Sequence, residues 1–261
     1  MAILDKGDEA ILPVPYWVSY EEMIKLAEAK PVLCKTDERF KLTADMVEEK
    51  ITTKTKMLIL NTPSNPTGAI VEPNEIRKIA KLAVEHNFYV ISDEVYEHFI
   101  YGNNEHLSIA SLNEEIKNLT ILSNSVSKTY AMTGWRIGYS ACNKEIIKAM
   151  DNLQSHSTSN PTSIAQYAAL EALNGPQDSV KQMVKAFDER RKLIHKRLNE
   201  LDGISCVEPE GAFYAFPDIS ETGMASMEFA SKLLDEALVA VVPGIAFGSD
   251  KHVRLSYAAS M

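Results

Sequence analysis

Three short apolar segments constrain the fold of this chain more than any other feature of its sequence. They lie at 57–61 (MLILN), 88–92 (FYVIS) and 119–123 (LTILS), and each runs directly into polar residues. Near-continuous apolar runs of this length are typical of strands in a parallel sheet that is covered on both faces. Ligands bind beyond the carboxyl ends of the strands in such open α/β sheets. If the three strands are neighbours, the polar residues that follow them share one site.

The rest of the chain alternates short strand-like runs with longer helical periods, which predicts an α/β fold with a mainly parallel sheet between helices. Further strands are expected at 11–14 and 31–34, and helices at 20–29, 72–87, 143–156, 161–174 and 176–201. Strand-like segments at 204–207, 212–216, 239–242 and 252–257 surround a helical pattern at 226–237. We therefore expect a large domain over 1–185 and a smaller α+β domain over 186–261.

Composition excludes several classes of partner. Lys and Arg number 27 against 36 Asp and Glu, a net charge of -9, which is the opposite of what nucleic acid or an anionic membrane attracts. The three cysteines lie far apart without a C-x-x-C pair, so neither a disulfide framework nor a metal site is expected. No signal peptide or membrane-spanning run is visible, and we expect a cytoplasmic protein.

Lys128 follows the third apolar segment in the sequence SVSK, and Arg136 lies eight residues further on. A lysine in a desolvated crevice near other cations has a lowered pKa and can form a Schiff base with an aldehyde. Ser125, Ser127 and Arg136 could then bind a phosphate. The alternative is an ordinary surface lysine in a loop.

Asp93 ends the second apolar segment, and Tyr96 follows three residues later. A partly buried carboxylate needs a partner, and a pyridinium N–H is one. The hydroxyl of Tyr96 and the side-chain amide of Asn65, which follows the first segment, could bind an oxygen on the same ring. The alternative for the segment from Asp93 to Tyr96 is an ordinary helix N-terminus, and the alternative for the NPTG sequence around Asn65 is a turn.

Two further residues fit such a site. Trp17 could stack on a flat aromatic ligand, or pack in the core. Arg254 stands among strand-like residues and suits a two-point clamp on a substrate carboxylate, although such arginines are also found as surface charges on edge strands.

Six segments together resemble the class I/II aminotransferases that use pyridoxal 5'-phosphate, and most closely the bacterial-type aspartate aminotransferase branch. The segments are PYWVSY, NTPSNPTG, SDEVY, SNSVSKTYAMTGWRIGY, EGAFY and HVRLSYA, and the similarity runs along essentially the whole chain. The resemblance implies a large cofactor-binding domain, a small C-terminal domain and a homodimer. The implied reaction moves an amino group from an amino acid, aspartate above all, to a 2-oxo acid such as 2-oxoglutarate.

The resemblance also implies roles for nine residues. Lys128 would be the catalytic residue and carry the internal aldimine, and Arg254 would bind the α-carboxylate of the substrate. Cofactor contacts would come from Trp17, Asn65, Asp93, Tyr96, Ser125, Ser127 and Arg136, with Trp17 and Asn65 also next to the substrate.

Members of this family begin well before the segment around Leu4 and continue beyond Met261. We therefore expect a fragment in which the large domain lacks a phosphate-binding helix N-terminus and the small domain lacks a helix. Two alternatives stay open. One is another enzyme of the same fold, such as an aromatic or alanine aminotransferase or a C–S lyase, and the other is a remnant that folds but does not catalyse.

Overall fold

A computed structural model describes residues 1–261, which form two sheets and nine α-helices. The larger sheet has the strand order β2-β1-β3-β4-β5-β6, and all neighbours are parallel except β5 and β6. The second sheet has the order β7-β9-β8 and is antiparallel. The strands are β1 (Glu9–Val14), β2 (Lys30–Lys35), β3 (Thr55–Asn61), β4 (Tyr89–Asp93), β5 (Thr120–Ser125), β6 (Gly138–Ala141), β7 (Tyr214–Ala215), β8 (Val242–Pro243) and β9 (Val253–Ser256).

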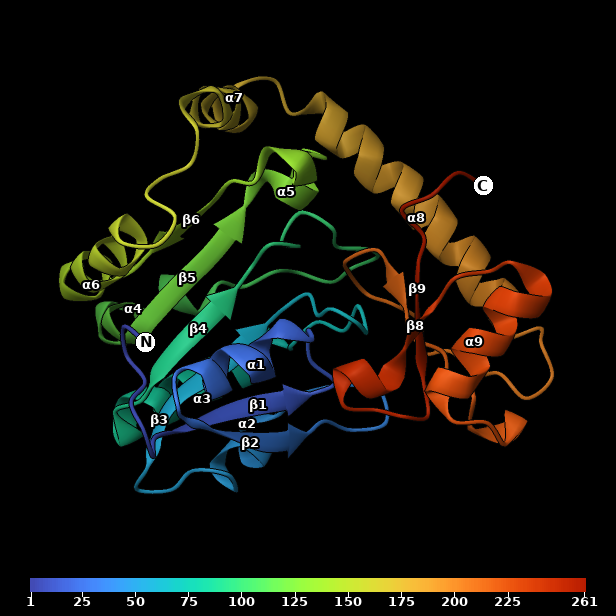
Figure 1. Ribbon diagram of the computed structural model, residues 1–261, viewed down its shortest axis with the longest axis horizontal. Coiled ribbons are helices and arrows are strands. Elements are labelled where there is room, and N and C mark those ends of the chain that lie inside the picture. The colour runs from blue at the N-terminus through green and yellow to red at the C-terminus, as the bar shows by residue number, and fades with distance from the viewer.

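The helices alternate with the strands of the larger sheet and then dominate the second half of the chain (Figure 1). They are α1 (Ser19–Leu26), α2 (Ala44–Glu48), α3 (Pro73–His86), α4 (Glu114–Leu119), α5 (Val126–Thr129), α6 (Lys144–Ser155), α7 (Ser163–Asn174), α8 (Asp178–Leu198) and α9 (Ser226–Ala237). None of them is long and apolar enough to cross a lipid bilayer.

Strand β3 shows why the larger sheet needs helices on both faces. Leu58 and Leu60 pack into the largest apolar cluster, with Ile76 and Ile79 of α3. Met57 and Ile59 point to the other face and pack in a second cluster, which includes Ile24 of α1. Since successive strand residues alternate between faces, an unbroken apolar run is what a strand covered on both sides requires.

In Figure 1 the arrows of β1 and β2 point toward the second sheet, and the long helix α8 runs along the outer edge of the molecule from α7 to the region of α9. The last residues of β3, β4 and β5, which are Asn61, Asp93 and Ser125, line the same cavity as Arg254 of β9. Three apolar segments that the sequence predicts as neighbours are indeed adjacent, because β4 pairs with β3 on one side and with β5 on the other. The predicted mainly parallel α/β fold is confirmed.

One predicted strand is wrong, a second is misplaced and one strand is missed. The strand predicted at 239–242 is misplaced because β8 begins only at Val242, while the backbone N–H of Val239 still donates to Leu233 at the end of α9. Residues 204–207 form only an isolated bridge from Ser205 to Asp218, because the backbone N–H of Cys206 donates to the Asn199 side chain at 3.0 Å instead of to a strand. The apolar spacing there reflects packing of Cys206 against Leu198 at the end of α8. The missed strand, β6, is exposed along its whole length and so carries no apolar signal.

Candidate active site

A cavity of about 460 Å³ lies at the carboxyl ends of β3, β4 and β5. All nine residues that the sequence singles out line it, together with Tyr20, Asn61 and Tyr214. The nine are Trp17, Asn65, Asp93, Tyr96, Ser125, Ser127, Lys128, Arg136 and Arg254. The structure thus brings together side chains that are spread over more than 200 residues of sequence.

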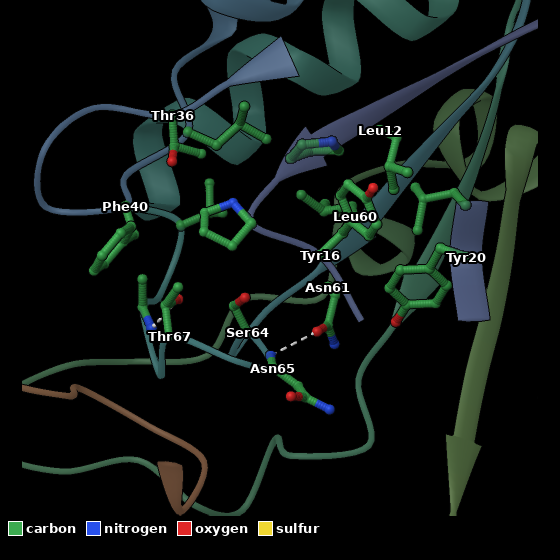
Figure 2. Close-up of a pocket in the computed structure, with 16 residues that line it drawn as sticks. Leu12, Tyr16, Tyr20, Thr36, Phe40, Leu60, Asn61, Ser64, Asn65 and Thr67 are labelled. Carbon is green, nitrogen blue, oxygen red and sulfur yellow. Dashed lines mark hydrogen bonds between the residues drawn. The ribbon is translucent and has the colours of Figure 1, made fainter. Parts of the chain in front are cut away.

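The register of the sheet explains this convergence. Asn61 at the end of β3 pairs with Asp93 at the end of β4, and Asp93 pairs with Ser123 of β5. The Asn61 amide links two parts of the site, since its Nδ2 donates to the backbone carbonyl of Asp93 at 3.1 Å and its Oδ1 accepts from the backbone N–H of Asn65 at 2.9 Å. Figure 2 shows the second of these bonds in the adjoining, smaller pocket, where Tyr20 and Asn61 are also drawn.

Both carboxylate oxygens of Asp93 accept hydrogen bonds. The Tyr20 hydroxyl donates to Oδ2 at 2.5 Å, and the backbone N–H of Val95 donates to Oδ1 at 3.2 Å. Burial raises the pKa of Asp93, while these two hydrogen bonds oppose that shift because they stabilise the ionised form. An acceptor of this kind, enclosed in a cavity, can bind a further cationic N–H.

Lys128 lies in the short helix α5, whose first turn is capped by Ser125. The Ser125 hydroxyl accepts from the backbone N–H of Ser127 at 2.9 Å and donates to the Ile137 carbonyl at 3.1 Å. Burial lowers the pKa of Lys128, and the neighbouring charges of Arg254 and Arg136 lower it further. The amine therefore loses its proton more readily than that of an ordinary lysine. The neutral amine is the form that attacks a carbonyl carbon.

Arg254 of β9 reaches the cavity from the second sheet. Its Nη1 donates to Oδ1 of Asn65 at 2.8 Å, and its guanidinium lies over the rings of Tyr214 and Phe247, at 4.5 and 4.9 Å from their centroids. The Tyr214 hydroxyl in turn lies 2.9 Å from that of Tyr96. These contacts fix the plane of the guanidinium and leave donors free for a carboxylate ligand.

Arg136 and Trp17 border the cavity more loosely. Arg136 adopts a left-handed backbone conformation (φ 54°), and its Nη1 donates to the Thr133 carbonyl at 2.7 Å. The side chain is exposed, so its remaining donors can bind an anion. The Trp17 ring meets the Tyr20 ring edge-on at 5.3 Å between centroids and is partly accessible from the cavity.

Known proteins match this chain along its full length. The family described as aminotransferase class I and II matches residues 1–261. The chain belongs to the class I and II aminotransferases. It is 53% identical to an aspartate aminotransferase from Bacillus sp. (strain YM-2), over 99% of this chain and 68% of that protein.

Solved structures of other aminotransferases share the fold. An aromatic aminotransferase from Pyrococcus horikoshii OT3 superposes with a TM-score of 0.95 at 46% identity, over 99% of this chain and 70% of the other. The Thermus thermophilus aspartate aminotransferase solved with maleate gives a TM-score of 0.93 at 44% identity, over 99% of this chain and 68% of the other.

Class I and II aminotransferases depend on pyridoxal phosphate, and the donor set of this member fits that cofactor. Lys128 supplies an amine that makes no hydrogen bond to the chain and can condense with the cofactor aldehyde. Asp93 supplies a carboxylate for the ring nitrogen, and Arg136 supplies a cation for the phosphate. The fit therefore rests on three complementary groups around one cavity.

The sequence analysis missed seven of the sixteen lining residues of this aminotransferase, among them Asn61, Tyr214 and Tyr20. Asn61 is the last residue of an apolar strand, so the rule that strand ends carry ligand contacts would have found it. Tyr214 stands in the EGAFY segment that carries part of the family resemblance. Tyr20 ends the PYWVSY segment, which also carries part of the resemblance, but no local pattern links it to Asp93, which lies 73 residues away in the sequence.

Proposed function

We propose that this aminotransferase transfers the amino group of aspartate to 2-oxoglutarate, which yields oxaloacetate and glutamate. The observation that carries the proposal is that the Lys128 amine, the Asp93 carboxylate and the Arg254 guanidinium line one cavity. Three relatives at 48–53% identity are aspartate aminotransferases, and they support the choice of a dicarboxylic substrate.

In this proposal the cofactor is held at several points. Asp93 binds the ring nitrogen, Asn65 and Tyr96 approach the ring hydroxyl, and Trp17 covers one face of the ring. Arg136 and the hydroxyls of Ser125 and Ser127 bind the phosphate. The Ser125 hydroxyl already donates to the Ile137 carbonyl and must give up that bond to donate to a phosphate, so it contributes less than the charge of Arg136.

Lys128 does the proton chemistry. Once bound, the cofactor acts as an electron sink that makes the α-hydrogen of the amino acid acidic. The neutral Lys128 Nζ would accept that proton and hold it beside the reacting carbon. Burial and the charges of Arg254 and Arg136 favour the neutral amine by lowering its pKa. Arg254 binds the α-carboxylate and keeps the reacting carbon within reach of Nζ.

An aromatic substrate is the second candidate. The Pyrococcus horikoshii aromatic aminotransferase is as similar in fold to this chain as the aspartate enzymes are. Arg254 does not separate the two candidates, because every α-amino acid carries the carboxylate that it would bind.

We also propose a homodimer and a division of the chain at about residue 185. Helices α6 and α7 support the dimer because they expose apolar side chains, most of all Ile164 and Tyr167 at 72% and 75% exposure. Contiguous exposed apolar surface of this kind marks interaction sites. The three strands of the second sheet, all beyond residue 185, support the division.

The test begins with covalent trapping. The purified chain is mixed with pyridoxal phosphate and reduced with borohydride, and peptide mass spectrometry locates the pyridoxyl group. We expect the label on Lys128, and an unlabelled protein after Lys128→Ala. Lys148→Ala, at an exposed position of α6, serves as the control. Amino transfer is then measured with aspartate and with phenylalanine against 2-oxoglutarate.

The outcomes separate the candidates. Glutamate formation with aspartate supports the first proposal, and formation only with phenylalanine supports the second. A label elsewhere than on Lys128 contradicts the assigned site, and a correct label without any amino transfer contradicts the proposed activity.

A further inference from the structure

Tyr20 of α1 makes a buried contact with Asp93 at the end of β4. Its hydroxyl donates to Asp93 Oδ2 at 2.5 Å, and the residue as a whole is 6% exposed. The bond joins the first helix of the chain to the strand that carries the carboxylate. It lies in the wall of the cavity, which both residues line.

The direction of this hydrogen bond is fixed by its surroundings. Burial, and then the charge of Asp93, raise the pKa of Tyr20 well above its usual value, so the phenol keeps its proton. Tyr20 is thus a donor to the carboxylate. The backbone N–H of Val95 occupies the other oxygen, Oδ1, and the two donors together hold the carboxylate plane in one orientation.

We propose that Tyr20 is a positioning residue that keeps Asp93 ionised and aimed at the ring nitrogen of bound pyridoxal phosphate. The inference rests on the proposed function, which assigns Asp93 to that nitrogen. A carboxylate that is enclosed without enough donors takes up a proton, and a protonated carboxyl group no longer stabilises a cationic ring nitrogen. Tyr20 supplies the side-chain donor that prevents this.

Tyr16 provides a matched control. It is 7% exposed, close to the value for Tyr20, and its hydroxyl also donates to a carboxylate, that of Glu21. Neither Tyr16 nor Glu21 lines the 460 Å³ cavity. Tyr16→Phe therefore removes the same group from the same part of the chain without touching Asp93.

The experiment compares Tyr20→Phe, Tyr16→Phe and Asp93→Asn with the unchanged chain. The dissociation constant of pyridoxal phosphate is measured by absorbance titration, and the state of the ring nitrogen by NMR of cofactor labelled with ¹⁵N at that position. We expect Tyr20→Phe to weaken binding about tenfold, the loss of one charge-assisted hydrogen bond, and to shift the ¹⁵N resonance toward the unprotonated form. Tyr16→Phe should change neither value.

The results distinguish a failure of the role proposed for Tyr20 from a failure of the proposed assignment of Asp93. If Asp93→Asn weakens binding but Tyr20→Phe changes affinity less than twofold and leaves the resonance in place, the role of Tyr20 is wrong. If Asp93→Asn itself has no effect, the assignment of Asp93 is wrong and the inference fails with it. The NMR spectra are recorded with each variant in excess at a concentration far above its own dissociation constant, so that bound cofactor gives the resonance and weaker affinity alone cannot imitate the shift.

Discussion

Arg254 and Asn65 are joined by a hydrogen bond of 2.8 Å from Nη1 to Oδ1, although 189 residues separate them in the chain. Arg254 belongs to the small sheet, and Asn65 follows a strand of the large one. The bond therefore ties the two sheets together at the wall of the cavity. It also orients a guanidinium that has no carboxylate partner within the chain, which is what a binding group for an anionic substrate requires.

If Arg254 has its proposed role, Arg254→Ala should weaken the binding of maleate, a dicarboxylate that resembles the proposed dicarboxylic substrate. Loss of a charge-assisted pair costs about 2–3 kcal/mol, or roughly 30- to 150-fold in the dissociation constant. Isothermal titration of the cofactor-loaded protein measures the change. Arg197→Ala, at a largely exposed position of α8, is the control. An altered cofactor spectrum in Arg254→Ala would speak against a role confined to the substrate.

Asn61→Ala should destabilise the folded chain, because it leaves the Asp93 carbonyl and the Asn65 N–H without their partner. Unpaired polar groups at a partly buried site cost about 1–3 kcal/mol. Urea denaturation measures the free energy of unfolding, with Asn160→Ala at an exposed position as the reference. Equal stability of the two variants would show that the amide link contributes nothing.

Lys128→Met should raise the free energy of unfolding at neutral pH. Burial and two arginines lower the pKa of Lys128 in the folded state, so the charged amine is less favourable there than in the unfolded chain. The increase in the free energy of unfolding of Lys128→Met is complete below the folded-state pKa of the lysine. It disappears as the pH rises to the ordinary lysine pKa of 10.5. Thermal melts across this range test the prediction, and a gain that does not change with pH would refute it.

Glu94→Gln should lower the free energy of unfolding by about 2–4 kcal/mol at pH 7. Glu94 is buried and accepts from Ser92 Oγ and Ser108 Oγ, both at 2.7 Å, and lies 2.9 Å from His106 Nε2. Burial raises the pKa of this carboxyl, but the three hydrogen bonds outweigh burial and hold the pKa below its usual value of 4.5.

The pH dependence of the Glu94 effect follows from that shift. Stabilisation by the carboxylate is complete above pH 4.5 and is lost as the pH falls through the lower, folded-state pKa. The difference between wild type and Glu94→Gln should therefore shrink in acid, as measured by urea denaturation at several pH values. A difference that grows on acidification would contradict the proposed ionised state.

Ile164→Lys combined with Tyr167→Lys should convert the proposed dimer into a monomer. Both side chains are more than two-thirds exposed on α7, so the substitutions leave the fold of one chain intact while charging the apolar surface. Light scattering coupled to size-exclusion chromatography gives the molar mass. Leu238→Lys, at an 85% exposed position after α9, is the control. A wild-type chain that is already monomeric would overturn the dimer itself.

Local patterns were sufficient to predict most of the strands and most of the helices. Strands β3, β4 and β5 carry near-continuous apolar runs because all their residues are buried or half-buried, and α3 carries an apolar stripe because one of its faces packs in the core. The polar residues after these strands could be assigned to one site for the same reason, since parallel strands end at one edge of a sheet. Exposed β6 and the five-residue helix α2 have no such pattern.

The sequence by itself determined the α/β architecture and nine of the sixteen residues of the cavity wall, because apolar periodicity, polar residues at strand ends and the family resemblance identify them. Only the tertiary structure decided which of those residues contact one another. Tyr20 with Asp93 and Asn65 with Arg254 are pairs whose members lie 73 and 189 residues apart. Such contacts depend on how helices and sheets pack in three dimensions, and no local pattern in the chain encodes that packing.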